Sequence, residues 1–145
     1  MIMQRIKGWE QAYVRFTISC LRRSWEWSQF DCCMFAADGI KAVTGEDFGA
    51  PYRGQYETES EAYEFLASLG YADLGALASS RLPEILQDGE PAPSLARRCD
   101  IVLTPTRDGR GQALAICDGI SLIGPYARGL QHLPMSMALR AWRVG

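Results

Sequence analysis

The order of apolar and polar residues divides the chain into a helical first part and a strand-rich second part. Between Gly8 and Arg23, apolar residues recur at helical spacing and predict an amphipathic helix whose buried stripe is Trp9, Ala12, Tyr13, Phe16 and Cys20. Over residues 24–30 large aromatic residues alternate with polar ones. This alternation indicates an extended segment that leads into a second helix.

Start and stop signals bound two further helices. Asp31 is a good N-cap residue and Gly45 provides a left-handed stop, so the second helix is expected between them. Residues 58–61 form a capping box that opens a third helix, which Gly70 closes. Residues 46–57 are expected to form an irregular loop. Residues 71–98 are expected to be a mixed stretch with one short helical turn near residues 82–86.

The apolar pattern becomes strand-like from Cys99 onward. It predicts strands at residues 100–104, 112–117 and 120–123, with Asp118-Gly119 as a tight hairpin turn, and two more at 129–133 and 139–144. Helices followed by strands predict an α+β fold. We expect one domain over residues 1–145, with a helical half of about 1–98 and a sheet half of about 99–145.

Composition narrows the possible functions. The 145 residues carry 15 basic and 17 acidic side chains, so no basic excess points to nucleic acid or a membrane surface. No apolar run approaches the roughly 20 residues of a membrane span, and residues 1–5 lack the pattern of a signal peptide. The five cysteines form no C-x-x-C pair and are expected to be free thiols, with no metal or cofactor. Cys20 and Cys117 are expected to be small buried hydrophobes.

A candidate reactive thiol lies at the start of the second predicted helix. Cys32 follows the N-cap Asp31, so it falls in the first turn, where free backbone N–H groups and the helix dipole favour a thiolate. A thiol prepared in this way is a typical nucleophile, and the same N–H groups can stabilise an oxyanion. Cys33 lies about 100° further round the helix. The alternative is that both cysteines simply pack at a helix start.

Two motifs give the chain a family resemblance. Asp31-Cys32-Cys33 is similar to the Asp-Cys-(Ser/Ala) motif that begins the helix of NlpC-type papain-like cysteine peptidases. Cys99-Asp100-Ile101-Val102 is similar to their Gly-Asp-hydrophobic strand, with Cys in place of Gly. The resemblance implies a papain-like domain in which N-terminal helices pack on a small antiparallel β-sheet, with Cys32 in the place of the nucleophile.

A closer resemblance covers most of the chain from Asp31 onward. Residues 31–38, 44–45, 52–56, 96–102, 115–119 and 138–144 resemble, in order and spacing, a small family of uncharacterised proteins encoded among the tail-tip genes of tailed phages, prophages and gene transfer agents. This resemblance implies a virion protein of the tail tip or baseplate, assembled in the bacterial cytoplasm. Its partners would be other tail-tip and hub proteins, contacted through the N-terminal helix, the 52–56 loop and the C-terminal strand.

One departure from the peptidase pattern concerns the general base. Gln112 stands where NlpC-type peptidases carry their histidine, and glutamine has no titratable group near neutral pH. The one histidine, His132, lies twenty residues later, where it is either a rescue base or a structural residue. We therefore expect a structural tail-tip component on a catalytically degenerate peptidase fold. The alternative is an active cysteine amidase or endopeptidase that degrades peptidoglycan during genome entry.

Overall fold

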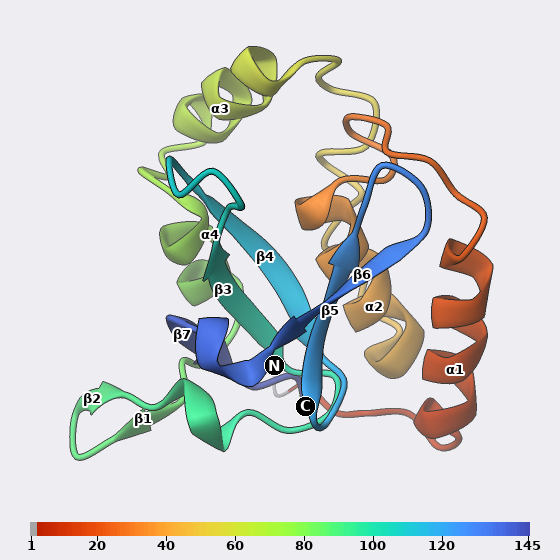
Figure 1. The fold of residues 1–145 in the computed structure, drawn as a ribbon, viewed down its shortest axis with the longest axis vertical. Coiled ribbons are helices and arrows are strands. Elements are labelled where there is room, and N and C mark those ends of the chain that lie inside the picture. Colours follow the sequence, from red (N-terminus) through yellow and green to blue (C-terminus); the bar gives the residue numbers. More distant parts are fainter. Residues whose placement is uncertain (1–2) are drawn as a thin grey trace.

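The protein combines four α-helices with a small antiparallel sheet, so the predicted α+β class is confirmed (Figure 1). The computed structural model describes residues 3–145. Its helices are α1 (Trp9–Cys20), α2 (Cys32–Thr44), α3 (Glu59–Ser68) and α4 (Leu74–Arg81), with short 3-10 helices at Pro93–Leu95 and Met135–Met137. Its strands are β1 (Leu86–Gln87), β2 (Glu90–Pro91), β3 (Ile101–Pro105), β4 (Gln112–Cys117), β5 (Ser121–Pro125), β6 (Leu130–Pro134) and β7 (Arg140–Trp142).

The main sheet has the strand order β6-β5-β4-β3-β7, with every neighbouring pair antiparallel. Strand β4 pairs with β3 over five residues, from Gln112 opposite Pro105 to Ile116 opposite Ile101. In contrast, β4 pairs with β5 only at Ile116 and Cys117. The two strands therefore separate toward the start of β4, and α2 begins behind this gap (Figure 1).

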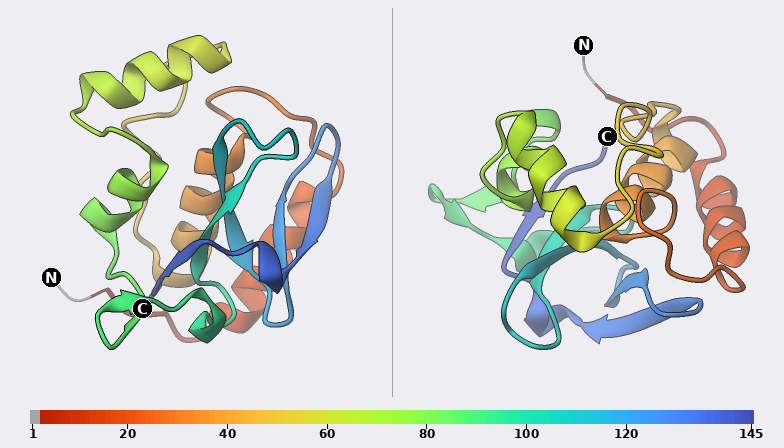
Figure 2. Two further views of the ribbon diagram at one scale, coloured as in Figure 1. Left: turned by 60° about the vertical axis from the view of Figure 1, so that its left-hand side comes forward. Right: turned by 90° about the horizontal axis from the view of Figure 1, so that it is seen from above.

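Alternating side chains give the sheet two buried faces. The face under the helices carries Ile101, Leu103, Leu114, Ile116 and Trp142, and it packs on the apolar sides of α1, α2 and α4. The opposite face carries Val102, Ala115, Cys117, Leu122 and Ala141, and residues 85–96 and 133–138 cover it. Figure 2 shows the helices gathered on one side of the strands. Strands buried on both faces account for the nearly continuous apolar runs of β3 and β4.

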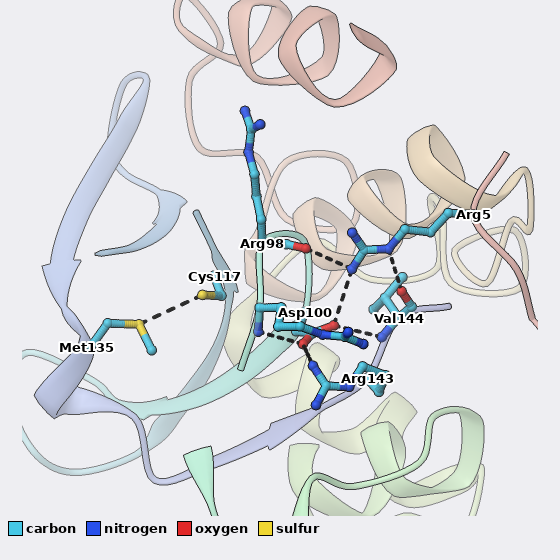
Figure 3. A network of polar contacts seen from close by, with 8 residues as sticks. Arg5, Arg98, Asp100, Cys117, Met135, Arg143 and Val144 are labelled. Atoms are coloured by element: carbon cyan, nitrogen blue, oxygen red, sulfur yellow. Dashed lines mark hydrogen bonds and ion pairs between the residues drawn. The ribbon is translucent and has the colours of Figure 1, made fainter. Parts of the chain in front are cut away.

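A buried carboxylate ties both ends of the described chain to β3 (Figure 3). Asp100 is fully buried, and it accepts hydrogen bonds from the backbone N–H groups of Arg97 at 2.7 Å and Val144 at 3.0 Å. The Arg143 guanidinium pairs with the same carboxylate at 2.6 Å, and Arg5 lies 3.5 Å from it. Arg5 also donates to the Val144 carbonyl at 2.8 Å. A buried charge requires such pairing.

Two local expectations were wrong. No helical turn forms at residues 82–86. The helix of this region, α4, lies earlier, since it is capped by Asp73 and ends at Arg81, and residues 86–91 form the β1–β2 hairpin. Residues 24–30 are not one extended segment, because Ser28 takes a left-handed φ of 64° and Glu26 pairs back with Phe30. The C-terminal strand β7 lies at the edge of the main sheet, and there the Ile85 N–H donates to the Ala141 carbonyl at 2.8 Å.

Candidate functional site

The first turn of α2 is held in place by one buried carboxylate. Asp31 caps the helix by accepting a hydrogen bond from the Met34 N–H at 2.8 Å, as its sequence position predicts. Its second oxygen accepts from the Ser28 N–H at 2.9 Å and from the Tyr56 hydroxyl at 2.7 Å. The carboxylate thus joins the residues before the helix, the helix itself and the 47–56 loop, which fixes the position of the neighbouring Cys32.

Close packing of α2 on β4 sets the depth of Cys32. Gly39 lies two helical turns after Cys32, and a Cβ atom at this position would collide with the end of the Ile116 side chain. Glycine therefore lets the helix approach the strand closely. Leu114 lies two residues before Ile116 on β4, and its backbone N–H is one of the groups that lower the pKa of Cys32.

Hydrogen bonding lowers the pKa of the Cys32 thiol below its ordinary value. The Cys33 thiol makes the largest contribution, and the backbone N–H groups of Leu114 and Cys33 add to it. These donors outweigh burial and the negative charge of Asp31, both of which raise the Cys32 pKa. The pKa of Cys33 is raised, because Cys33 donates to its neighbour and is itself desolvated. Of this pair, Cys32 is the thiol whose pKa is lowered.

The half-buried Cys32 lies in a large open cleft. The cleft has a volume of about 1090 Å³ and runs between the start of α2, helices α3 and α4, and the turn that joins β3 to β4. Trp25 and Trp27, which contact each other edge to face with ring centroids 5.1 Å apart, form one part of its wall. Both Cys32 and the exposed Gln112 line it, so the structure brings these two predicted site residues to one cleft.

The third predicted site residue lies elsewhere. His132 is exposed on β6, opposite Ile123, with its Nδ1 3.4 Å from the Ser121 hydroxyl. It is outside the set of described residues that line the cleft. Of the two roles that the sequence left open for His132, that of a rescue base for Cys32 would require this side chain to lie in the cleft.

The remaining cysteines behave as packing residues. Cys20 and Cys117 are buried, as predicted, and Cys99 is buried with them. Desolvation raises the pKa of all three thiols, that of Cys99 to about 12. These thiols are therefore protonated and inert at neutral pH.

The 52–56 loop divides its side chains between the cleft and the core. Tyr52 and Tyr56 line the cleft, and Tyr56 is nearly buried. Arg53 turns away and pairs with Asp38 of α2 at 2.8 Å and with Asp47 at 3.4 Å. Both carboxylates belong to the same chain, so Arg53 ties the 52–56 loop to α2 and to Asp47.

Sequence reasoning missed the walls of the cleft. Helix α3 contributes Glu59, Tyr63 and Phe65, and the β3–β4 turn contributes Arg107 and Arg110. These residues lie far from Cys32 in sequence and carry no motif. The Arg107 side chain donates to the Tyr126 hydroxyl at 2.9 Å and so links the β3–β4 turn to the β5–β6 turn.

The fold and the site together define an α+β protein in which a cysteine at the start of a helix lines an open cleft. The chain belongs to the family DUF6950, a domain of unknown function, whose family model matches residues 4–144. No curated protein and no solved structure matches the chain. None of the helices formed by residues 3–145 combines the length and apolar character needed to cross a bilayer. Across the same residues, no group of three or more His, Cys, Asp or Glu side chains is arranged to hold a metal ion.

Proposed function

We propose that the protein is a structural component of a phage tail tip or baseplate, built on a catalytically degenerate NlpC-type peptidase fold. One observation carries this proposal: Cys32 and Gln112 line the same cleft, whereas His132 lies outside it. The cysteine-led helix α2, packed on the antiparallel strand β4, supports the relationship to papain-like peptidases.

The chemistry of amide cleavage explains why the cleft favours a non-hydrolytic function. A thiolate can attack a carbonyl carbon, but the leaving amine must then take up a proton from a positioned acid. The amide of Gln112 neither accepts nor releases a proton near neutral pH. Cys32 therefore has a nucleophile's position, while the residue in the place of the peptidase histidine transfers no proton.

The outward side of α1 supports a role in assembly. Val14, Ile18 and Leu21 repeat at helical spacing, and 41%, 60% and 56% of their respective surfaces are exposed. Apolar side chains grouped on an exposed helix face are typical of contact surfaces. Other tail-tip and hub proteins are the proposed partners of this face.

Complementation of a phage that lacks the gene tests the proposal. We expect Cys32→Ala to restore intact and infective particles, because the thiol takes part in no reaction. Ile18→Glu is expected to give particles with missing or defective tips, and Ser19→Glu on the same helix is the matched control. Electron microscopy of particles and plaque counts provide the readouts. Normal Cys32→Ala particles that fail to infect, or particles that do not contain the protein, would contradict the proposal.

A second candidate function is an active cysteine amidase or endopeptidase acting on peptidoglycan. The lowered pKa of Cys32 and the open cleft favour it. Purified wild-type protein incubated with peptidoglycan would then release new amino groups, and Cys32→Ala would release none. Equal and negligible release by both proteins excludes this function in the isolated chain.

A further inference from the structure

The two edges of the main sheet differ in how far the chain covers them. Strand β6 (Leu130–Pro134) is the outermost strand at the end opposite β7 (Figure 1). At the β7 edge, backbone hydrogen bonds join residues 83–85 to residues 141–143. At the β6 edge, residues 23–25 form such bonds only with residues 127–129, in the turn before the strand. Within the described chain, β6 itself is therefore an uncovered edge.

The register of the β5–β6 hairpin determines which backbone groups of β6 face outward. The Tyr126 N–H donates to the Gly129 carbonyl at 2.9 Å. Hydrogen-bonded and non-hydrogen-bonded pairs alternate along an antiparallel ladder, so Gln131 and Leu133 are the residues of β6 that bond to β5. The even-numbered residues of β6 therefore point their backbone N–H and C=O groups away from the sheet.

These outward groups are the ones that a further strand would bind. Leu130 and His132 each offer an N–H and a C=O, whereas Pro134 has no N–H and offers only its C=O. Among residues 3–145, no other segment forms a backbone hydrogen bond with them. Native proteins commonly protect such an edge with lysine or a bulge. Strand β6 contains no lysine, and its register with β5 is continuous.

Both ends of the open edge limit the partner that can bind there. Residues 23–25 occupy the edge just before Leu130, and the chain turns into the 3-10 helix Met135–Met137 directly after Pro134. A docking strand therefore has room only opposite residues 130–134 and must leave the edge at both ends. A second copy of β6, running antiparallel, has this length and the same limits. It also brings no Asp, Glu, Lys or Arg, so no like charges of these side chains oppose each other.

We propose that β6 is the surface through which two copies of this chain associate, by antiparallel pairing of one β6 with the other about a twofold axis at His132. In this register the two His132 residues exchange backbone hydrogen bonds, and each Leu130 N–H donates to the Pro134 carbonyl of the other copy. The two sheets become one continuous sheet through a self-complementary contact. The inference goes beyond the tail-tip proposal and does not depend on it, because it concerns the protein alone.

Hydrogen exchange measured by NMR at increasing protein concentration tests the pairing directly. Exchange of the Leu130 and His132 amides should slow as the concentration rises, because these N–H groups become bonded only in the pair. The amide of Ile120, whose residue is 91% exposed at the β4–β5 turn, should exchange at a constant rate. A contact of five residues buries little area, so we expect a dissociation constant of about 10–1000 µM by sedimentation.

Substitutions at His132 separate its backbone from its side chain. His132→Pro removes the N–H at the axis, and proline is tolerated on an edge strand where its nitrogen faces solvent. We expect this variant to associate about tenfold more weakly than the wild type, because the two N–H donors at the axis are lost. The matched control, His132→Ala, keeps the N–H and should preserve association.

Disulfide cross-linking keeps the test informative even where His132→Pro fails to fold. His132→Cys should give a covalent dimer with oxidised glutathione, since the Cα atoms of a directly opposed pair lie about 5.5 Å apart. Ser121 lies beside His132 on β5, so its two copies would be about 14 Å apart, which is three strand spacings. Ser121→Cys should therefore not cross-link. Peptide mapping identifies the linked residue.

Three results would overturn the proposal. Monomeric protein with concentration-independent exchange at Leu130 and His132 would leave the edge for a strand of a different partner. Undiminished association of folded His132→Pro protein would place the contact on another surface. Equal cross-linking of the His132→Cys and Ser121→Cys proteins would exclude the register. All of these results come from the purified chain, so they are independent of particle assembly.

Discussion

Removal of the Asp31 carboxylate should destabilise the protein far more than loss of an ordinary helix cap. Asp31→Ala deletes three hydrogen bonds, to the Met34 N–H, the Ser28 N–H and the Tyr56 hydroxyl. A hydrogen bond to a charged group contributes about 1.5–3 kcal/mol, and the effects of neighbouring bonds are not additive. Because Ser28 and Tyr56 are buried, their donors would also be left without partners. We expect a loss of about 3–5 kcal/mol in the free energy of unfolding.

Asp73→Ala provides a matched control for this variant. Asp73 caps α4 through one hydrogen bond, from the Ala76 N–H at 2.8 Å, and its side chain is exposed. Loss of an exposed cap of this kind costs about 1 kcal/mol. The two substitutions are chemically identical, so the difference between them isolates the two additional bonds that Asp31 makes inside the protein.

Urea unfolding followed by circular dichroism at neutral pH measures both losses. A domain of this size is typically stable by about 5–15 kcal/mol, so both variants should remain folded in buffer. The expected difference of about 2–4 kcal/mol corresponds to a Tm difference of the order of 10 °C. If Asp31→Ala costs no more than Asp73→Ala, the three bonds do not act as described and the placement of Cys32 by Asp31 is refuted.

The remaining predictions concern packing, thiol reactivity and pH. Gly39→Ala should destabilise the protein by about 1–2 kcal/mol in urea unfolding despite the better helix propensity of alanine, and stabilisation would contradict the close helix–strand contact. Iodoacetamide should modify Cys32 at a lower pH than free cysteine and leave Cys99 unmodified until unfolding, as peptide mapping can establish. A hydrogen bond from Arg140 lowers the pKa of Glu84, so the ionised pair stabilises the folded protein above about pH 4.5. Glu84→Gln should therefore be less stable than the wild type above that pH, and the difference should vanish as the pH falls through the lowered pKa of Glu84. A loss that persists at pH 2–3 would show that packing, and not charge, is responsible.

Residues adjacent in sequence were enough to predict the first turn of α2, which carries Cys32. Asp31 as an N-cap and Cys32 in the first turn are consequences of adjacent residues, and the structure confirms both. The strands from Ile101 to Pro125 were similarly evident, because their apolar runs are bounded by turn residues. The expected pairing of Cys32 with Gln112 at one cleft came from the family resemblance, and the structure places both residues there.

Long-range contacts account for what the sequence did not reveal. Helix α4 was missed because its cap, Asp73, precedes a segment with a weak apolar pattern. The covered edge of β7 depends on Pro83 and Ile85, which are distant in sequence and have no strand signal of their own. The same holds for the aromatic wall of the cleft, because Trp25 and residues of α3 line one cleft only through the folding of the whole chain.

The Asp100 network has a consequence for the order of folding. Its carboxylate is fully buried, yet Arg143 and Val144, two of the groups that neutralise or bond it, are made 43 and 44 residues later. A nascent chain that ends before them would bury this charge at the head of β3 with only Arg5 and the Arg97 N–H as partners, which is unfavourable. The helices can form during translation, whereas we expect the central sheet to reach its full stability only after residue 144 has left the ribosome.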